Sequence, residues 1–318
     1  MPRNEQFKLS IVVPMYFEQE VARECHRRLT EALTGRFDYE IIYVNDGSTD
    51  DTLPILRELA AADEHVRVIS FSRNFGHQAA VTAGTRAAAG DAVVIIDADL
   101  QDPPELIPDM VRLWQDGWDV VYAKRAKRKG ESPFKLLTAK LFYRFLRLMT
   151  DTRIPEDTGD FRLMDRRVVA AFGKMPEHNR FIRGMVAWLG FRQTPILYER
   201  DERYAGVTKY PLRRMLKFAA DGILSFSTRP LRIMIQLGGL SLLVALGILI
   251  YALVVRLTGR ALSPGWASVM VTITFLGGIE LLSLGVLGAY IGRIYAESQN
   301  RPLYLVAETI RVDEEKLQ

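Results

Sequence analysis

Short apolar runs alternate with amphipathic segments along residues 9–123. Five runs have the length and composition of buried strands, at 9–14, 39–45, 66–70, 92–96 and 119–123. The stretches between them repeat apolar positions at helical spacing, at 18–33, 52–62, 78–88 and 104–115. Strands that alternate with helices predict an α/β fold with a doubly wound, mostly parallel sheet.

Two much longer apolar stretches lie near the C-terminus, at 233–255 and 269–291. Each approaches the ~20 residues that a helix needs to cross a bilayer, so we expect two transmembrane helices, with buried core helices as the alternative. Upstream, residues 133–150 and 210–232 mix apolar side chains with lysine and arginine. That composition is typical of helices lying in the membrane interface, although a helix packed on the globular core is the alternative for both.

The pattern divides the chain into four parts. We expect a globular domain at 1–209, which includes the interfacial helix at 133–150, and a juxtamembrane amphipathic helix at 210–232. Two membrane helices joined by a short loop occupy 233–291, and a tail follows at 292–318.

Basic residues gather beside the predicted membrane helices. Those before the first helix are Arg203, Lys209, Arg213, Arg214, Lys217, Arg229 and Arg232. The second helix is followed by Arg293, Arg301, Arg311 and Lys316, whereas the loop between the helices has only Arg256 and Arg260. Because positive charge marks cytoplasmic segments, we expect both termini and the globular domain in the cytoplasm. The net charge of +4 therefore points to lipid headgroups and not to nucleic acid.

Compartment signals agree with that orientation. The single cysteine, Cys25, cannot form an intrachain disulfide and fits a reducing compartment. The N-terminus has no apolar stretch of the signal-peptide type, so we expect that the globular domain is not exported.

Acidic residues follow the predicted strands. Asp97 and Asp99 end the run 92–96, and Asp46 ends the run 39–45. Carboxylates two residues apart on an extended chain project to the same side, at the sheet edge where α/β proteins bind ligands. They repel each other unless a cation lies between them, and Mg²⁺ or Mn²⁺ suits oxygen ligands; solvated loop acids are the alternative. The absence of GxGxxG and GxxxxGK[ST] motifs removes the main support for dinucleotide and P-loop sites.

Several motifs together resemble family 2 glycosyltransferases. They are Ile-Val-Val-Pro-Met-Tyr-Phe-Glu (11–18), Val-Asn-Asp-Gly-Ser (44–48), Ser-Arg-Asn-Phe-Gly (72–76), Asp-Ala-Asp-Leu-Gln-Asp-Pro-Pro-Glu (97–105) and Asp-Thr-Gly-Asp-Phe-Arg-Leu-Met-Asp-Arg (157–166). The resemblance continues through 199–200, 209–210 and 300–302. It is closest to the dolichol-phosphate mannose synthase branch, and within it to bacterial polyprenyl-phosphate glucosyltransferases with two C-terminal membrane helices. It implies a GT-A-like nucleotide-sugar domain.

The resemblance also implies a donor site. Its nucleotide-sugar residues would be Pro14, Tyr16, Glu18, Asp46, Asp97 and Asp99. Mg²⁺ or Mn²⁺ on Asp97, Asp99 and Gln101 would neutralise the departing diphosphate. Three of these assignments have a structural alternative. Asp46 could stabilise a turn, Glu18 could be an acid in the first turn of a helix, and Gln101 could cap a helix.

The implied acceptor is a polyprenyl phosphate. Asp157 and Asp160 are the candidates to orient or deprotonate it, although either could instead cap the loop. Arg162 is the first choice for binding its phosphate, with Arg125 and Lys209 as weaker choices. Attack opposite the leaving nucleotide would invert the anomeric carbon, as the resemblance implies.

These observations predict an inverting, metal-dependent transfer of a hexose to polyprenyl phosphate at the cytoplasmic face of a bacterial inner membrane. Glucose from UDP-glucose and undecaprenyl phosphate are the favoured substrates. The alternatives are a GDP-mannose or UDP-amino sugar donor and, in another class, a non-catalytic scaffold that binds nucleotide sugar.

Two further expectations concern residues outside the motifs. The histidines are scattered without metal-ligand spacing and are interpreted as ordinary polar residues: His26, His65, His77 and His178. Glu280 falls near the middle of the second membrane helix, where a carboxylate is costly in lipid. We expect it at a contact in a homo-oligomer, with a hydrogen bond to Ser283 or Ser241 as the alternative.

Overall fold

A computed structural model describes residues 6–126, 158–198, 227–258 and 265–317. Its chain forms two compact units. One unit holds the sheet and includes Arg301–Gln318, and the other contains two long helices. Each unit is described by itself below.

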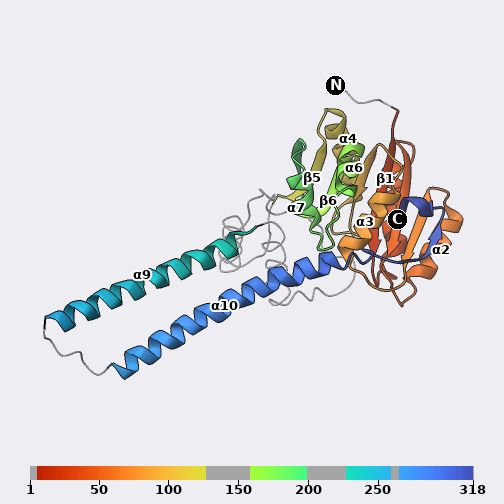
Figure 1. The fold of residues 1–318 in the computed structure, drawn as a ribbon. Coiled ribbons are helices and arrows are strands. Elements are labelled where there is room, and N and C mark those ends of the chain that lie inside the picture. Colours follow the sequence, from red (N-terminus) through yellow and green to blue (C-terminus); the bar gives the residue numbers. More distant parts are fainter. Residues whose placement is uncertain (1–5, 127–157, 199–226, 259–264, 318) are drawn as a thin grey trace. The chain divides into compact units, whose positions relative to one another are not determined.

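The first unit is built on a sheet of eight strands in the described residues, in the order β7-β5-β6-β4-β1-β2-β3-β8 (Figure 1). The strands are β1 (Lys8–Met15), β2 (Asp38–Asn45), β3 (Val66–Phe71), β4 (Ala92–Ile95), β5 (Val120–Arg125), β6 (Thr158–Asp165), β7 (Gln193–Tyr198) and β8 (Val306–Ile310). Four neighbouring pairs are parallel, whereas β6 runs antiparallel to β4 and β5, and β8 antiparallel to β3. The predicted mainly parallel α/β sheet is confirmed, but β6, β7 and β8 come from segments with no predicted strand.

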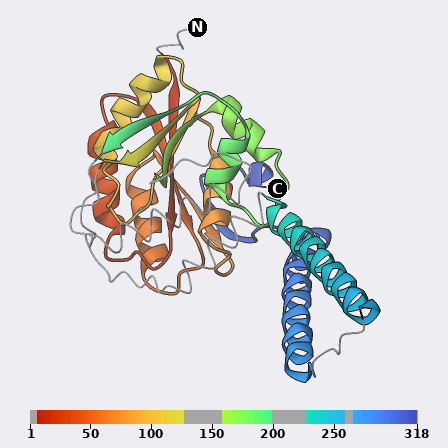
Figure 2. The same cartoon turned by 90° about the vertical axis from the view of Figure 1, so that its left-hand side faces the viewer.

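Helices cover both faces of this sheet (Figure 2). They are α1 (Ala22–Leu33), α2 (Thr52–Ala62), α3 (His77–Ala87), α4 (Ile107–Gln115), α6 (Arg166–Gly173) and α7 (Ile182–Trp188), with short 3₁₀ helices η1 (Pro104–Leu106) and η2 (Glu314–Leu317). Helices α1, α2 and α4 bury their apolar side chains against alternate residues of β1, namely Leu9, Ile11, Val13 and Met15. Helices α3, α6 and α7 form a second group, in which α6 contacts both α3 and α7.

A glycine lets α3 lie directly on the sheet. A Cβ atom added to Gly84 would come within 2.3 Å of Val12 Cγ1 and 3.1 Å of Val44 Cγ2. Those two valines belong to β1 and β2, so α3 crosses the strands at a distance that only glycine permits. The first turn of α3, which begins at His77, thereby lies at the carboxyl edge of the parallel strands.

The chain after the second long helix returns to the sheet. Strand β8 pairs antiparallel with β3, with Ile310 opposite Val68 and Glu308 opposite Ser70. This arrangement differs from the tail expected at 292–318, because the helix continues to Ser298 and a strand follows it.

The second unit contains α9 (Arg229–Leu257) and α10 (Trp266–Ser298). Their apolar segments, Arg229–Tyr251 and Ser268–Ser298, have mean hydropathies of 2.4 and 1.9, and none of their most apolar stretches is buried in the single chain. Both are long and apolar enough to cross a membrane, as the sequence predicts. Contacts within the unit include a hydrogen bond from Ser283 Oγ to Met234 Sδ at 3.2 Å.

Two predicted features cannot be compared with this structure. The interfacial helix at 133–150 and most of the juxtamembrane segment at 210–232 lie outside the described residues.

Candidate functional site

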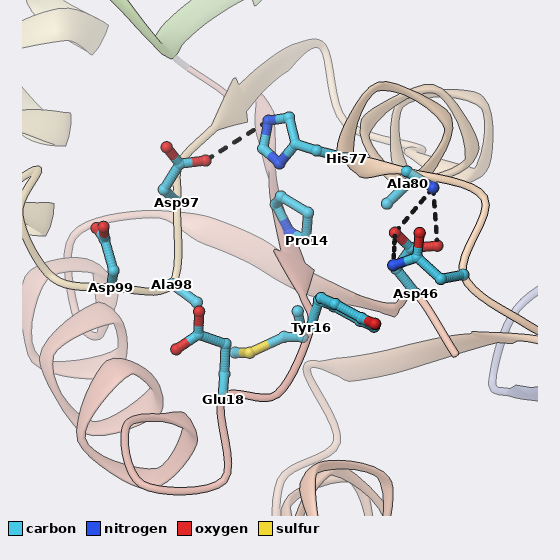
Figure 3. A pocket seen from close by; sticks show the side chains of 12 residues that line it. Pro14, Tyr16, Glu18, Asp46, His77, Ala80, Asp97, Ala98 and Asp99 are labelled. Carbon is cyan, nitrogen blue, oxygen red and sulfur yellow. Dashed lines mark hydrogen bonds and ion pairs between the residues drawn. The ribbon is translucent and has the colours of Figure 1, made fainter. Parts of the chain in front are cut away.

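A cavity of about 340 Å³ opens at the carboxyl ends of β1, β2 and β4 (Figure 3). Because these three strands are parallel neighbours, the residues that follow them meet at one edge of the sheet. The lining residues are Pro14, Met15, Tyr16, Glu18, Asp46, Asn74, Gly76, His77, Ala80, Asp97, Ala98 and Asp99. The structure thus brings together all six residues that the sequence suggests for a nucleotide sugar.

Asp97 and Asp99 follow β4, and both carboxylates point to the same side of the cavity (Figure 3). The Oδ1 atom of Asp97 is buried and has no hydrogen-bond partner within the described residues. Burial raises the pKa of Asp97 to about 6, against the opposing effect of His77 and with the help of nearby carboxylates. Asp99 is 9% exposed, and its Oδ1 accepts a hydrogen bond from Gln101 N at 3.2 Å.

This donor set fits a divalent cation that also contacts a phosphate. The described residues contain no group of three His, Cys, Asp or Glu side chains arranged to hold a metal. Mg²⁺ needs fewer protein ligands, since it commonly takes one or two carboxylates and completes its shell with phosphate oxygens and water. Asp97 Oδ1, which accepts no hydrogen bond in the described residues and lies beside Asp99, suits that role, whereas the Gln101 side chain is not in the cavity lining.

Asp46 organises the loop after β3. Its carboxylate accepts hydrogen bonds from Phe75 N at 2.7 Å, Gly76 N at 3.0 Å and Asn74 Nδ2 at 3.0 Å. The next residue, Gly47, has a φ of +68°, and a Cβ there would lie 2.2 Å from the backbone of Arg73. Asp46 therefore lines the cavity and also fixes the loop that forms one of its walls.

The segment after β1 supplies an aromatic wall. Tyr16 is 45% exposed, and its ring lies 4.4 Å from that of Phe17. Phe17 adopts a φ of +57°, a backbone conformation that is strained for a bulky residue, and its N–H donates to Ser48 Oγ at 3.1 Å. Glu18 N donates to Thr52 Oγ1 at 3.0 Å, which places the Glu18 side chain beside the cavity. The Tyr16 ring beside the Glu18 carboxylate suits a nucleoside, with the ring against the base and the carboxylate against the ribose hydroxyls.

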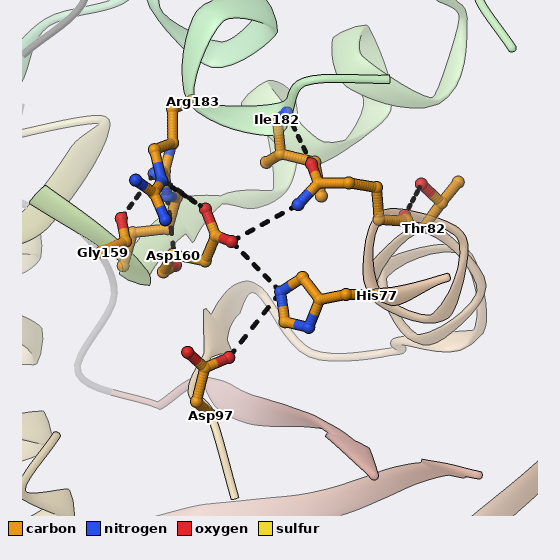
Figure 4. A network of polar contacts seen from close by, with 9 residues as sticks. His77, Thr82, Asp97, Gly159, Asp160, Ile182 and Arg183 are labelled. Carbon is orange, nitrogen blue, oxygen red and sulfur yellow. Dashed lines mark hydrogen bonds and ion pairs between the residues drawn. The ribbon is translucent and has the colours of Figure 1, made fainter. Parts of the chain in front are cut away.

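The interpretation of His77 as an ordinary polar residue is wrong (Figure 4). Its Nε2 lies 3.1 Å from Asp160 Oδ2 and 3.7 Å from Asp97 Oδ1. Burial alone would lower the pKa of His77, but the hydrogen bond to Asp160 and the charges of both carboxylates outweigh it and raise the pKa to about 9. A protonated His77 therefore links Asp97, which follows β4, to Asp160 in β6 at the wall of the cavity.

Asp160 is enclosed by cationic and polar partners. Arg183 Nε donates to its Oδ1 at 2.8 Å, and Gln78 Nε2 donates to its Oδ2 at 3.4 Å. Although burial raises its pKa, the charges of Arg183, His77 and Arg162 outweigh burial and hold the pKa of Asp160 well below its usual value. A carboxylate of such low basicity is a poor general base, so this geometry suits a positioning role. The other candidate, Asp157, lies outside the described residues.

The residues expected to bind an acceptor phosphate have different surroundings. Arg162 is 4% exposed and donates to the carbonyl oxygens of Asp160 and Gly159 at 3.2 and 3.1 Å, so its guanidinium is engaged within its own strand. Arg125 ends β5, and its Nε is buried without a hydrogen-bond partner in the described part of the chain. Its guanidinium lies near Gly159, and so does the carboxylate of Asp102. That carboxylate accepts a hydrogen bond from the Tyr198 hydroxyl. Lys209 lies outside the described residues.

Several known proteins are similar to this chain. The model of the family described as glycosyl transferase family 2 matches residues 10–173. An uncharacterized glycosyltransferase of Bacillus subtilis, YkcC, is 49% identical over 318 residues, which cover 100% of this chain and 98% of that protein. The SfII prophage-derived bactoprenol glucosyl transferase of Shigella flexneri is 41% identical over 309 residues, covering 96% and 99%. Among solved structures, glucosyl-3-phosphoglycerate synthase from Mycobacterium tuberculosis aligns with a TM-score of 0.44 at 20% identity over 69% of this chain and 78% of that chain.

Proposed function

Because the chain belongs to glycosyl transferase family 2, we propose that this glycosyltransferase moves glucose from UDP-glucose to undecaprenyl phosphate at the cytoplasmic face of a membrane. The observation that carries the proposal is the cavity at the carboxyl edge of the sheet, where Asp97 and Asp99 meet the loop fixed by Asp46. The name of the Shigella relative, a bactoprenol glucosyl transferase, supports glucose and a polyprenyl lipid. The two candidate membrane helices agree with a lipid acceptor.

On the donor side, each group has a distinct task. Asp97 and Asp99 would hold Mg²⁺ or Mn²⁺, which when bound supplies positive charge to the diphosphate leaving group. His77, held as a cation by Asp160, adds positive charge to the same wall of the cavity. Tyr16 and Glu18 would bind the base and ribose.

On the acceptor side, a phosphate oxygen attacks the anomeric carbon while the bond to UDP breaks. A phosphate is already nucleophilic, so the enzyme must mainly orient it and offset its charge. Arg125, with its unpaired Nε, fits that task better than Arg162, whose guanidinium is bound within β6. Asp157 is the proposed orienting acid or base. In-line attack from the side opposite UDP inverts the anomeric centre.

A donor panel tests the proposal. The purified full-length chain, in lipid vesicles with Mg²⁺ and undecaprenyl phosphate, would be offered UDP-glucose, GDP-mannose and a UDP-amino sugar in parallel. We expect UDP-glucose to react fastest and NMR of the product lipid to show a β-linked glucose. Fastest transfer from another donor would contradict the sugar assignment, and binding of nucleotide sugar without any transfer would favour the scaffold alternative.

A further inference from the structure

The segment that follows α10 packs against the loop that forms a wall of the donor cavity. Leu305 O accepts a hydrogen bond from Ser72 N at 3.0 Å, directly after β3 ends. The ring of Tyr304 stacks on Phe71, the last residue of β3, with centroids 4.9 Å apart and planes 12° from parallel. Tyr304 and Phe71 are both buried, so this contact is shielded from water.

The contacts continue from Phe71 to the cavity. Phe71 meets the ring of Phe75 edge-to-face, with centroids 5.7 Å apart. The backbone N–H of Phe75 donates to Asp46 at 2.7 Å, and its neighbours Asn74 and Gly76 line the cavity. A continuous series of contacts, through Phe71 and Phe75, therefore joins Tyr304 to Asp46, whose carboxylate fixes the loop of residues 72–76.

Tyr304 is itself held in place. Its hydroxyl donates to Leu317 O at 3.0 Å, and the guanidinium of Arg86 lies 5.9 Å from the centre of its ring. Other bonds that attach β8 lie away from the loop, such as the ion pair between Arg57 on α2 and Glu308 on β8. These two kinds of attachment can be weakened separately.

We infer that Tyr304 is a positioning residue for the donor site: through Phe71 and Phe75 it holds the loop of residues 72–76 in the conformation that binds the nucleotide sugar. The inference rests on the proposed function of the cavity. The segment after α10 then contributes to donor affinity as well as pairing with the β3 edge of the sheet. A purely structural Tyr304 would affect stability without a selective effect on the donor.

The test compares three variants of the full-length chain with wild type. Tyr304→Leu removes the stacked ring but keeps an apolar side chain, and Tyr304→Phe keeps the ring but loses the hydroxyl. Glu308→Gln weakens the attachment of β8 without touching the loop. The measurements are the Kd for UDP by titration calorimetry, the KM values for donor and lipid acceptor, and the melting temperature.

We expect Tyr304→Leu to raise the Kd for UDP and the donor KM about threefold to tenfold, the scale of one lost aromatic contact. The acceptor KM should stay within about twofold of wild type, since the 72–76 loop lies on the donor side. Tyr304→Phe should bind UDP like wild type. Glu308→Gln should also bind UDP like wild type, even where it melts earlier.

Equal donor affinity in wild type and folded Tyr304→Leu would overturn the inference, as would equal losses in Tyr304→Leu and Glu308→Gln. If Tyr304→Leu does not fold, Phe75→Leu interrupts the same series at its half-buried end, next to the cavity, and must give the donor-selective loss. A wild-type chain that does not bind UDP at all would refute the proposed function and the inference with it, which is a different result from a variant that binds UDP as wild type does.

Discussion

Three carboxylates around the cavity differ in what surrounds them, and their surroundings decide what each can do. Asp46 is saturated by N–H donors of one loop, so it acts as a structural anchor. Asp160 is paired with Arg183 and His77 and stays ionised without being basic. Asp97 keeps a buried oxygen without a hydrogen bond, which leaves it able to bind a cation.

The proposed metal role predicts a large effect at the paired acids. Asp99→Ala should lower transfer by at least ~100-fold, the scale of losing one preorganised electrostatic contact, and Asp97→Ala should come close to it. The measurement is the initial rate of glucose transfer, with Glu58→Ala at an exposed position of α2 as a control that should behave like wild type. Undiminished transfer in excess chelator would refute metal dependence.

Asp160 and Asp157 should separate stability from turnover. Asp160→Asn removes the buried carboxylate that pairs with Arg183 and leaves His77 with Asp97 as its acidic partner, so it should lower the free energy of unfolding by ~3 kcal/mol. Asp157→Asn should keep donor affinity and stability but cut turnover strongly. Thermal melts, UDP titrations and rates distinguish the two, and the assignment is reversed if Asp160→Asn alone loses turnover while melting normally.

The strand-end acids could be predicted from the sequence because neighbouring parallel strands end at a common edge of the sheet. The role of His77 could not be predicted in this way. His77 meets Asp160 only because β6 pairs antiparallel with β4, with Arg162 opposite Ile95. That pairing joins segments far apart in sequence, and no local spacing of residues encodes it.

At the level of single elements, α3 carries the cavity wall and depends on its close approach to the sheet. Gly84→Ala would place a methyl group 2.3 Å from Val12 Cγ1, so α3 or β1 must move. We expect a loss of ~1–3 kcal/mol in unfolding free energy, typical of overpacking, together with weaker UDP binding. Gly173→Ala in α6 is the matched control, since a Cβ there meets nothing within 4 Å. Unchanged stability in Gly84→Ala would contradict the close packing of α3.

The strands β1, β2 and β3 also share a buried charge. The Glu40 carboxylate accepts hydrogen bonds from Ser10 Oγ at 2.6 Å, Ala89 N at 2.7 Å and Arg67 Nε at 2.6 Å. Burial by itself raises the pKa of Glu40, but these hydrogen bonds and the charge of Lys8 outweigh it, and the folded-state pKa lies below the usual 4.5.

Because its folded pKa is depressed, Glu40 should stabilise the fold fully above about pH 4.5, and this contribution should disappear as the pH falls through the folded-state pKa. Glu40→Gln should therefore melt earlier than wild type at pH 7 and show a smaller further loss between pH 5 and pH 3. Melting temperatures across that range check it, with Glu31→Gln, an exposed partner of Arg27, as the control. Parallel pH curves for wild type and Glu40→Gln would contradict the prediction.

The strands that sequence analysis found and missed differ in how they are buried. Strand β4 is a continuous apolar run, Ala-Val-Val-Ile, which reads as a strand without any context. Strand β6 is buried at all eight positions, yet it contains Asp160, Arg162 and Asp165, whose charges are compensated by partners elsewhere in the fold. Strand β8 is short and carries Glu308, so its pattern gives little signal before its pairing with β3 is known.

At the scale of the whole molecule, family membership and the two candidate membrane helices agree with the sequence-based expectations. The cytoplasmic orientation and the homo-oligomer stay predictions. In the single chain Glu280 is exposed, while Ser283 donates to Ile279 O and Ser241 to Leu237 O. Ser241 thus uses its hydroxyl proton within α9, and the Ser283 hydroxyl has acceptors in Ile279 O of its own helix and Met234 Sδ of α9.

The return of the chain to the sheet changes how the unit that holds the sheet should be isolated. Ending the chain near Arg229 removes the candidate membrane helices, but it also removes β8 and leaves the β3 edge without its partner. The ion pair between Arg57 and Glu308 and the Tyr304 stack on Phe71 are lost as well. Such a truncated chain should melt earlier and aggregate, because an exposed strand edge pairs readily with other chains.

Deleting only residues 229–300, and joining residues 228 and 301 by a flexible Gly-Ser linker, should restore stability and UDP binding because β8 can pair with β3 again. Its transfer to undecaprenyl phosphate in vesicles should stay far below that of the full chain, since the apolar segments that we expect to hold it at the membrane are absent. Melting temperature, UDP titration and vesicle assays separate these effects. Equal stability of the truncated and the linker-joined chains would show that β8 is dispensable, and full vesicle activity of the linker-joined chain would refute the membrane role of α9 and α10.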